Sequence, residues 1–186
     1  MKVIGVLDIQ GSVIEHVKML EGLGVEVLRV KTASDLEAVS GLIIPGGEST
    51  VIGKLMAIYG LDKEIRRRVA EGTLAVWGTC AGAILLAKDC GDQRVQGLGV
   101  MDIVVERNAY GRQLESFETE VEFGGRAVKA VFIRAPRIVK VGERVEILAL
   151  RGGEIVAARD GKLMATCFHP ELTDDRSVHE YFLEMC

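Results

Sequence analysis

The sequence predicts an α/β fold of three layers, in which a doubly wound, mostly parallel sheet lies between helices. In the first half of the chain, short β-branched runs alternate with stretches of helical periodicity, which is the rhythm of βαβ units. The runs at 42–44 and 74–76 are apolar throughout, as expected for strands that helices cover on both faces. From 97 to 166, short strands separated by glycine-rich turns indicate hairpins or additions that make the sheet mixed, with short antiparallel strands among them.

The predicted elements follow this division. In the first half, strands are expected at 2–7, 25–30, 41–44 and 73–77. A helix is expected at 12–23, and two helical stretches precede the fourth strand. In the second half, strands are expected at 121–123, 127–133, 145–150, 154–158 and 163–166. A closing helix carries an apolar stripe, and an aspartate at 174 or 175 stands where its N-cap belongs.

Length and charge narrow the class of protein. The 186 residues suit a single domain, 1–186, that buries roughly two-thirds of its surface. A net charge of -4 argues against binding to nucleic acid, which normally needs a basic face. The run Arg66 to Arg68 is expected on the solvated side of a helix. Residues 1–7 lack the long apolar core of a signal peptide or a membrane span, so a cytoplasmic location is expected.

One of the four cysteines stands in a distinctive context. Their spacing predicts neither a disulfide framework nor a zinc site, so no metal is expected. Cys80 follows an apolar strand, precedes a helical run and has glycines two positions away on each side, at Gly78 and Gly82. This pattern predicts a nucleophile elbow at a helix N-terminus, where the thiolate is favoured. The alternative is a small buried cysteine. The other three cysteines lack this context and are interpreted as structural.

A thiolate nucleophile needs a base that can also protonate a leaving amine. Of the three histidines, His16 and His179 lie inside predicted helices and are interpreted as ordinary helical side chains. His169 follows a predicted strand and comes two residues before Glu171, whose carboxylate would orient its imidazole. By itself a His-Pro-Glu triplet is a weak signal, because short matches arise by chance.

A second strand leads into a Pro-Gly-Gly turn. Free N–H groups near Gly47 would stabilise an oxyanion together with the N–H of Ala81. The alternative is a flexible turn capped by Ser49, and the local chemistry does not decide between the two.

Longer segments resemble a known family. They are GLIIPGGEST (41–50), WGTCAGAILLA (77–87), MDIVVERNAYGRQLESFE (101–118), VFIRAP (131–136) and FHPELTDD (168–175). Over essentially its whole length the chain resembles the glutaminase subunits of pyridoxal 5'-phosphate synthase, which are class I (triad) glutamine amidotransferases. The elbow and the His-Pro-Glu triplet would fit any member of that class. The segments ERNAYGRQ, FIRAP and PGGEST narrow the resemblance to these subunits.

The resemblance implies a flavodoxin-like sheet, hydrolysis of L-glutamine without a cofactor, and a set of roles. Cys80 would be the nucleophile, His169 the general base and acid, and Glu171 the group that orients His169. The N–H groups of Gly47 and Ala81 would form the oxyanion hole. Contacts to glutamine would come from Gly46, Gly47, Glu48, Ser49, Arg107, Ile133 and Arg134. Ammonia would pass to a (β/α)8-barrel synthase subunit in a hetero-oligomer.

Three other functions are disfavoured by the matching segments and by the intact Cys80, His169 and Glu171. The first is a glutaminase that serves another synthase, such as one of histidine or purine biosynthesis. The second is a regulatory module without activity, and the third is a cysteine peptidase or chaperone-like relative.

Two positions depart from the family pattern: Asp8 replaces a small apolar residue, and Arg137 replaces an aromatic one. Both changes are expected to affect the partner-facing surface rather than the chemistry.

Overall fold

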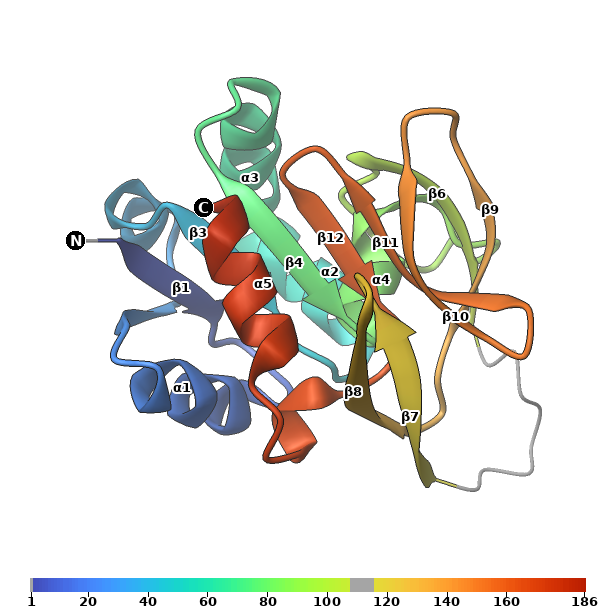
Figure 1. Ribbon diagram of the computed structural model, residues 1–186. Coiled ribbons are helices and arrows are strands. Elements are labelled where there is room, and N and C mark those ends of the chain that lie inside the picture. Colours follow the sequence, from blue (N-terminus) through green and yellow to red (C-terminus); the bar gives the residue numbers. More distant parts are fainter. Residues whose placement is uncertain (1, 108–115) are drawn as a thin grey trace.

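The computed structural model describes residues 2–107 and 116–186, and a mixed β-sheet runs through its centre (Figure 1). Five neighbouring strands are parallel, in the spatial order β2 (Glu26–Val30), β1 (Val3–Leu7), β3 (Gly41–Ile44), β4 (Ala75–Thr79) and β12 (Leu163–Thr166). This is the strand order of flavodoxin-like sheets, whose ligands bind at the carboxyl ends of the strands. The predicted α/β fold is confirmed.

Antiparallel strands extend the sheet beyond β12. The path continues through β11 (Glu154–Asp160), β10 (Glu146–Arg151), β7 (Phe117–Phe123) and β8 (Arg126–Phe132). A branch from β11 contains β9 (Arg137–Val141), then β6 (Met101–Glu106), which is parallel to β5 (Ala87–Asp89). The strands expected between 121 and 166 are therefore confirmed. The sequence patterns did not single out β5, β6 and β9.

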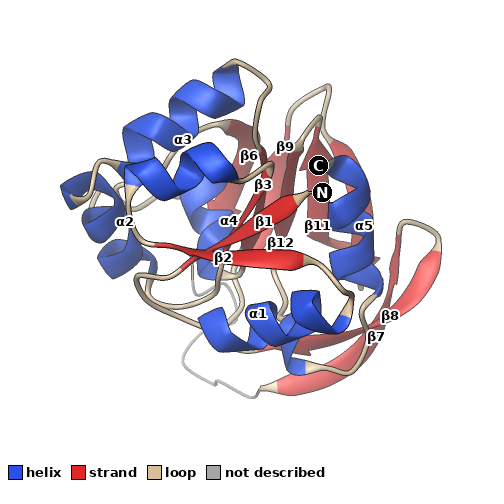
Figure 2. Cartoon of the chain, turned by 90° about the vertical axis from the view of Figure 1, so that its left-hand side faces the viewer, coloured by secondary structure: helices blue, strands red, loops and turns tan. Residues whose placement is uncertain are grey.

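Helices cover both faces of the sheet (Figures 1 and 2). One face carries α1 (Val13–Gly22) and α5 (Ser177–Met185), and the other carries α2 (Ser49–Ile58), α3 (Leu61–Ala70) and α4 (Ala81–Leu86). Two 3-10 helices, η1 (Ala33–Ala38) and η2 (Pro170–Leu172), lie in connections. Strands β3, β4 and β12 are buried at every position, which explains their uninterrupted apolar sequences.

Two local expectations were wrong. The N-cap of α5 is Arg176 rather than an aspartate, although the carboxylate of Asp175 accepts the N–H of Ser177 at 2.9 Å. In the basic run, Arg66 and Arg67 are exposed as expected, and Arg67 pairs with acidic residues of its own helix, but Arg68 is buried. Successive helical residues point in directions about 100° apart, so Arg68 faces away from the side on which Arg66 lies.

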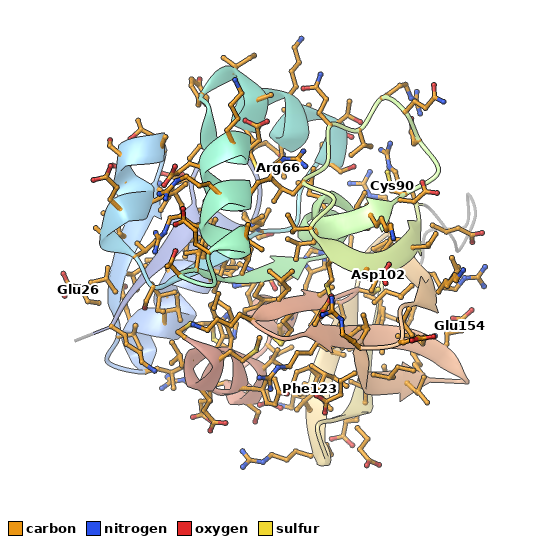
Figure 3. The ribbon with its side chains drawn as sticks, turned by 90° about the horizontal axis from the view of Figure 1, so that it is seen from above. Glu26, Arg66, Cys90, Asp102, Phe123 and Glu154 are labelled. Carbon is orange, nitrogen blue, oxygen red and sulfur yellow. The ribbon has the colours of Figure 1, made fainter. Side chains whose placement is uncertain are left out.

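The other two arginines of the run tie α3 to neighbouring segments. Arg66 donates to the carbonyls of Gly97 and Leu98, in the connection before β6 (Figure 3). Arg68 is buried and donates to the carbonyl of Leu36 in η1. Within the described residues, no helix has both the length and the apolar character needed to cross a membrane.

Candidate active site

A pocket of about 480 Å³ opens where β1, β3, β4 and β12 end. Its volume falls within the range usual for small-molecule sites. Every site residue predicted from the sequence lines this pocket except Glu171, which lies behind His169. The lining residues are Gln10, Gly11, Ser12, Glu15, Gly46, Gly47, Glu48, Ser49, Cys80, Ala81, Ile84, Arg107, Ile133, Arg134, His169 and Leu172.

Cys80 occupies a strained turn between β4 and α4. Its φ is 49° and its ψ is -103°, a conformation that a residue with a side chain rarely adopts and that is typical of functional sites. The flanking glycines make the turn possible: a Cβ at Gly78 would overlap the backbone of Gly82, and one at Gly82 would overlap the carbonyl of Ile44. The N–H of Cys80 donates to the carbonyl of Thr166 at 2.8 Å, which fixes the turn against β12.

His169 and Glu171 form a buried pair beside this turn. Nδ1 of His169 lies 2.7 Å from Oε1 of Glu171, and the N–H of His169 donates to the carbonyl of Val131 at 2.8 Å. Burial disfavours the imidazolium, but hydrogen bonds to Cys80 and Glu171 outweigh it and hold the pKa of His169 above its ordinary value. Burial likewise opposes ionisation of Glu171, yet the neighbouring histidines hold its pKa below its ordinary value. The arrangement favours an imidazolium paired with a carboxylate.

The remaining cysteines lie in different surroundings. Cys167 is fully buried, and burial raises its pKa well above the ordinary range of a thiol, so it stays protonated. Burial also raises the pKa of Cys186 to about 11. Cys90 is half-buried, and its Sγ lies 3.7 Å from the carbonyl oxygen of Asp92.

The loop after β3 is held by residues that follow β1. The carbonyl of Gly46 accepts the N–H of Ser12 at 3.0 Å, and Oε1 of Gln10 accepts the N–H of Glu48 at 2.9 Å. The carboxylate of Glu48 caps α2 by accepting the N–H groups of Thr50 and Val51. The alternative of a turn capped by Ser49 is therefore wrong, because Ser49 is the first residue of the helix.

Charges of both signs line the pocket wall. Glu15 and Glu48 are acidic, and Arg107 and Arg134 are basic. Arg107 lies 2.5 Å from the carboxylate of Asp92 and 3.4 Å from that of Glu48. Such a wall suits a ligand that carries both a carboxylate and an ammonium group.

The backbone around Ile133 closes the pocket beside Cys80. Arg134 has a φ of 44°, the second non-glycine residue of the described chain in this unfavourable region. Sγ of Cys80 lies 3.9 Å from the carbonyl oxygen of Ile133. The strained turn at Arg134 thus lies next to the candidate nucleophile.

Some lining residues were missed from the sequence. Gln10, Ser12 and Glu15 follow β1, and their position became a signal only once the sheet order placed β1 beside β3. Residues 108–115 of the resembling segment 101–118 lie outside the described residues.

The two departures from the family pattern form ion pairs within the chain. Oδ2 of Asp8 lies 2.9 Å from Nε of Arg29. Arg137 pairs with Glu106 at 2.8 Å and with Glu154 at 2.9 Å, and so links β6, β9 and β11. Among the described residues, no group of three or more His, Cys, Asp or Glu side chains is placed to hold a metal ion.

Comparison with known proteins gives a consistent result. A family model described as the SNO glutamine amidotransferase family matches residues 6–186. The chain is 57% identical to the pyridoxal 5'-phosphate synthase subunit PdxT of Herpetosiphon aurantiacus, over 97% of this chain and 98% of that protein. It is 53% identical to PdxT of Thermus thermophilus, over 98% and 97% of the two chains.

Solved structures agree with this result. A crystal structure of a glutamine amidotransferase superposes with a TM-score of 0.94 at 51% identity, covering 98% of this chain and 97% of that one. A structure of PurLQS from Thermotoga maritima, at 16% identity and a TM-score of 0.75, covers 98% of each of the two chains and shares the fold.

Proposed function

We propose a mechanism and a substrate site for this chain on the premise that it belongs to the SNO glutamine amidotransferase family. The chain is the glutaminase subunit of a pyridoxal 5'-phosphate synthase. It hydrolyses L-glutamine to L-glutamate and ammonia. The observation that carries the mechanism is the strained Cys80 turn beside the buried His169–Glu171 pair, in a pocket with charges of both signs.

The catalytic roles follow from the orientation of His169. Because Nδ1 of His169 faces Glu171, the other ring nitrogen, Nε2, serves Cys80. The Cys80 thiolate attacks the carbon of the glutamine side-chain amide, and the negative charge moves to the amide oxygen. His169 then gives a proton to the departing nitrogen, so that ammonia leaves and a γ-glutamyl thioester remains. Water, deprotonated by His169, hydrolyses the thioester to glutamate, and the Cys80 thiolate and the His169 imidazolium are restored.

The oxyanion is proposed to accept hydrogen bonds from two backbone N–H groups. Ala81 is the first residue of α4, and the first N–H groups of a helix have no acceptor within that helix. The second donor is Gly47, on the loop held by Ser12 and Gln10. Each such donor contributes roughly 10²–10³-fold to kcat.

The charged wall is proposed to bind the amino-acid end of glutamine. Arg107 would bind the α-carboxylate, with the backbone at Ile133 and Arg134 on the other side of the pocket. Glu48 and the backbone of Gly46, Gly47 and Ser49 would bind the α-ammonium end. Arg107 would exchange its contact with Glu48 for the substrate, because that contact is the longer of its two ion pairs.

The partner is proposed to be a (β/α)8-barrel synthase subunit that receives the ammonia. The relatives named PdxT are subunits of pyridoxal 5'-phosphate synthase, so a second subunit must build the product. The test is to purify this chain with a candidate barrel synthase and to identify the protein that co-elutes. Co-elution of a histidine- or purine-pathway synthase instead would contradict the proposed partner.

The catalytic assignment is tested with cysteine variants in that complex. Cys80→Ala should abolish ammonia release from glutamine and leave product formation from added ammonium intact. Cys90→Ala is the matched control, because Cys90 lies outside the pocket, and it should stay within a few-fold of the wild-type rate. Glutamine-dependent turnover by Cys80→Ala would overturn the nucleophile assignment.

A further inference from the structure

Behind the catalytic carboxylate lies a pair of buried histidines that the proposed mechanism does not use. His16 comes from α1 and His179 from α5, and both side chains are fully buried. Nδ1 of His16 lies 2.9 Å from Nε2 of His179. On its other side, Nε2 of His16 lies 3.6 Å from Oε2 of Glu171 and 3.3 Å from Oγ1 of Thr79. A continuous polar chain therefore runs from α5 to the carboxylate.

Two atoms along this chain lack an ordinary hydrogen bond. Oε2 of Glu171 and Nδ1 of His179 are buried and have no hydrogen-bond partner among the described residues. The Oε1 atom of Glu171 is already used by His169. Nε2 of His16 is thus the ring nitrogen that faces the free carboxylate oxygen, slightly beyond normal hydrogen-bond distance.

The charge state of His16 follows from its surroundings. Burial lowers the pKa of His16, although the nearby charge of Glu171 opposes this and the positive His169 reinforces it. The negative charge of Glu15, the neighbour of His16 on α1, raises the pKa of His16, as the charge of Glu171 does. Burial also lowers the pKa of His179 well below its ordinary value. Both side chains are therefore neutral near pH 7.

Neutral rings permit two arrangements of the shared proton. If His16 carries its proton on Nδ1, its Nε2 lone pair faces the carboxylate of Glu171, and Nδ1 of His179 becomes a buried N–H without an acceptor. If His179 donates from Nε2, the proton of His16 sits on Nε2 and points towards Glu171. The second arrangement does not turn a lone pair towards the carboxylate, and it leaves no buried N–H without an acceptor. It leaves only the lone pair on Nδ1 of His179 unpaired, and unsatisfied acceptors are less rare in proteins than unsatisfied donors.

We propose that His16 is a positioning residue for Glu171, held by His179 as the neutral tautomer whose Nε2–H points to Oε2 of the carboxylate. This role rests on the proposed pairing of His169 with Glu171 during catalysis. The N–H fixes the carboxylate so that Oε1 faces Nδ1 of His169. Because His16 brings no positive charge, the charge of Glu171 remains available to the imidazolium of His169.

The position of the chain also links the carboxylate to the nucleophile. Thr79, which shares Nε2 of His16, is the last residue of β4 and directly precedes Cys80. The Trp77 ring packs edge-on against both histidines, with centroid distances of 5.4 and 4.8 Å. A histidine that only filled space would not need its two ring nitrogens to face polar groups, as those of His16 face His179 on one side and Thr79 and Glu171 on the other.

The first test reads the tautomer directly in the wild-type protein. Nitrogen chemical shifts of ¹⁵N-histidine-labelled protein distinguish the neutral Nε2–H form, the neutral Nδ1–H form and the imidazolium. The resonances of His16 are assigned by their loss in a His16 variant. A neutral Nε2–H form from about pH 7 to 8 is expected, because burial lowers the pKa of His16 from its ordinary value. An Nδ1–H form, or an imidazolium in that range, would overturn the proposal whether or not the chain is a glutaminase.

The second test compares two amide replacements in the complex with synthase. His16→Gln can place an N–H near the former Nε2 and should keep kcat within a few-fold. His16→Asn places its amide near the former Nδ1, facing His179, and should lower kcat about tenfold or more with KM unchanged, since hydrogen bonds to charged groups are of that size. The acidic limb of its kcat/KM profile should move to higher pH, because Glu171 loses a donor that favours its charged form.

Folding is controlled for by normalising the rates to the fraction of Cys80 that a glutamine-analogue electrophile titrates at completion. Equal normalised kcat and pH profiles in wild type, His16→Gln and His16→Asn would show that His16 is merely structural. Loss of activity in Cys80→Ala together with unchanged His16→Asn would refute the positioning role alone. Activity that survives in Cys80→Ala would refute the proposed mechanism itself.

Discussion

Replacing Glu171 with glutamine isolates the electrostatic part of the His169–Glu171 pair. The side chain keeps its size and its hydrogen-bonding capacity but loses its charge. The hydrogen bond it weakens is short, at 2.7 Å, and Glu171 is only 4% exposed, so water cannot substitute for it. A hydrogen bond to a charged group contributes about 1.5–3 kcal/mol and a neutral one about 0.5–1.5 kcal/mol, so loss of the charge costs about 1–1.5 kcal/mol. Since about 1.36 kcal/mol corresponds to tenfold in rate, we expect kcat to fall about 5- to 13-fold.

Steady-state ammonia release, coupled to reductive amination of 2-oxoglutarate, measures this change as a function of pH. Without the carboxylate, the pKa of His169 should fall towards its ordinary value, so the imidazolium disappears at lower pH. The alkaline limb of the kcat/KM profile should move to lower pH. An unchanged profile, or a larger loss of kcat than for His169→Asn, would refute the assigned roles.

The same variant has a predicted effect on stability. The raised pKa of folded His169 stabilises the fold below about pH 6.5, and this contribution is lost as pH rises through the folded value. The lowered pKa of folded Glu171 stabilises the fold above about pH 4.5, and this contribution is lost as pH falls through the folded value. The difference in unfolding free energy between wild type and Glu171→Gln should therefore be largest between about pH 4.5 and about pH 6.5. A difference independent of pH in urea titrations would contradict the ion pair.

Three further outcomes are expected in the complex with synthase. His169→Asn should lower kcat for glutamine about 10²–10⁴-fold, because the general acid and base is removed, and pre-steady-state ammonia release measures this. Arg107→Ala should raise KM for glutamine and affect kcat less, since a residue that anchors the substrate acts equally in the ground and transition states. A fall in kcat alone would instead show that Arg107 shapes the geometry of the catalytic residues. The isolated chain should release ammonia about 10²–10³-fold more slowly than the complex, because we expect docking of the synthase to turn the Gly46–Gly47 peptide, whose carbonyl Ser12 holds in the isolated chain, so that the Gly47 N–H faces the oxyanion. Equal rates with and without synthase would show that the oxyanion hole is already formed.

Much of the candidate site could be predicted from local sequence because its residues follow strands. A nucleophile elbow is recognised by glycines on each side of a nucleophile after an apolar run, and Gly78 and Gly82 do pack too closely for any side chain. His169 and Glu171 are two positions apart, so their contact needs little information beyond the chain itself. The parallel half of the sheet was predictable for the same reason, since burial on both faces leaves uninterrupted apolar strands.

Features that depend on distant segments could not be predicted in this way. Arg68 was expected in solvent, but it is buried because η1 packs against α3 and offers a carbonyl. The short strands β5 and β6, and β9 beside them, are joined by pairings that no local pattern specifies. In β6, for example, buried residues alternate with more exposed ones, and the buried ones are covered only in the folded sheet.

The sequence by itself determined the family, the α/β fold and the residues that carry the proposed chemistry, because short, contiguous segments are enough to identify each of them. Only the tertiary structure decided how those segments are supported. His16 and His179 are 163 positions apart, and both read as ordinary helical residues until α1 and α5 pack on the same face of the sheet. Packing there excludes water, so each polar atom needs a partner from another segment, and Glu171 lies at the end of that chain of partners.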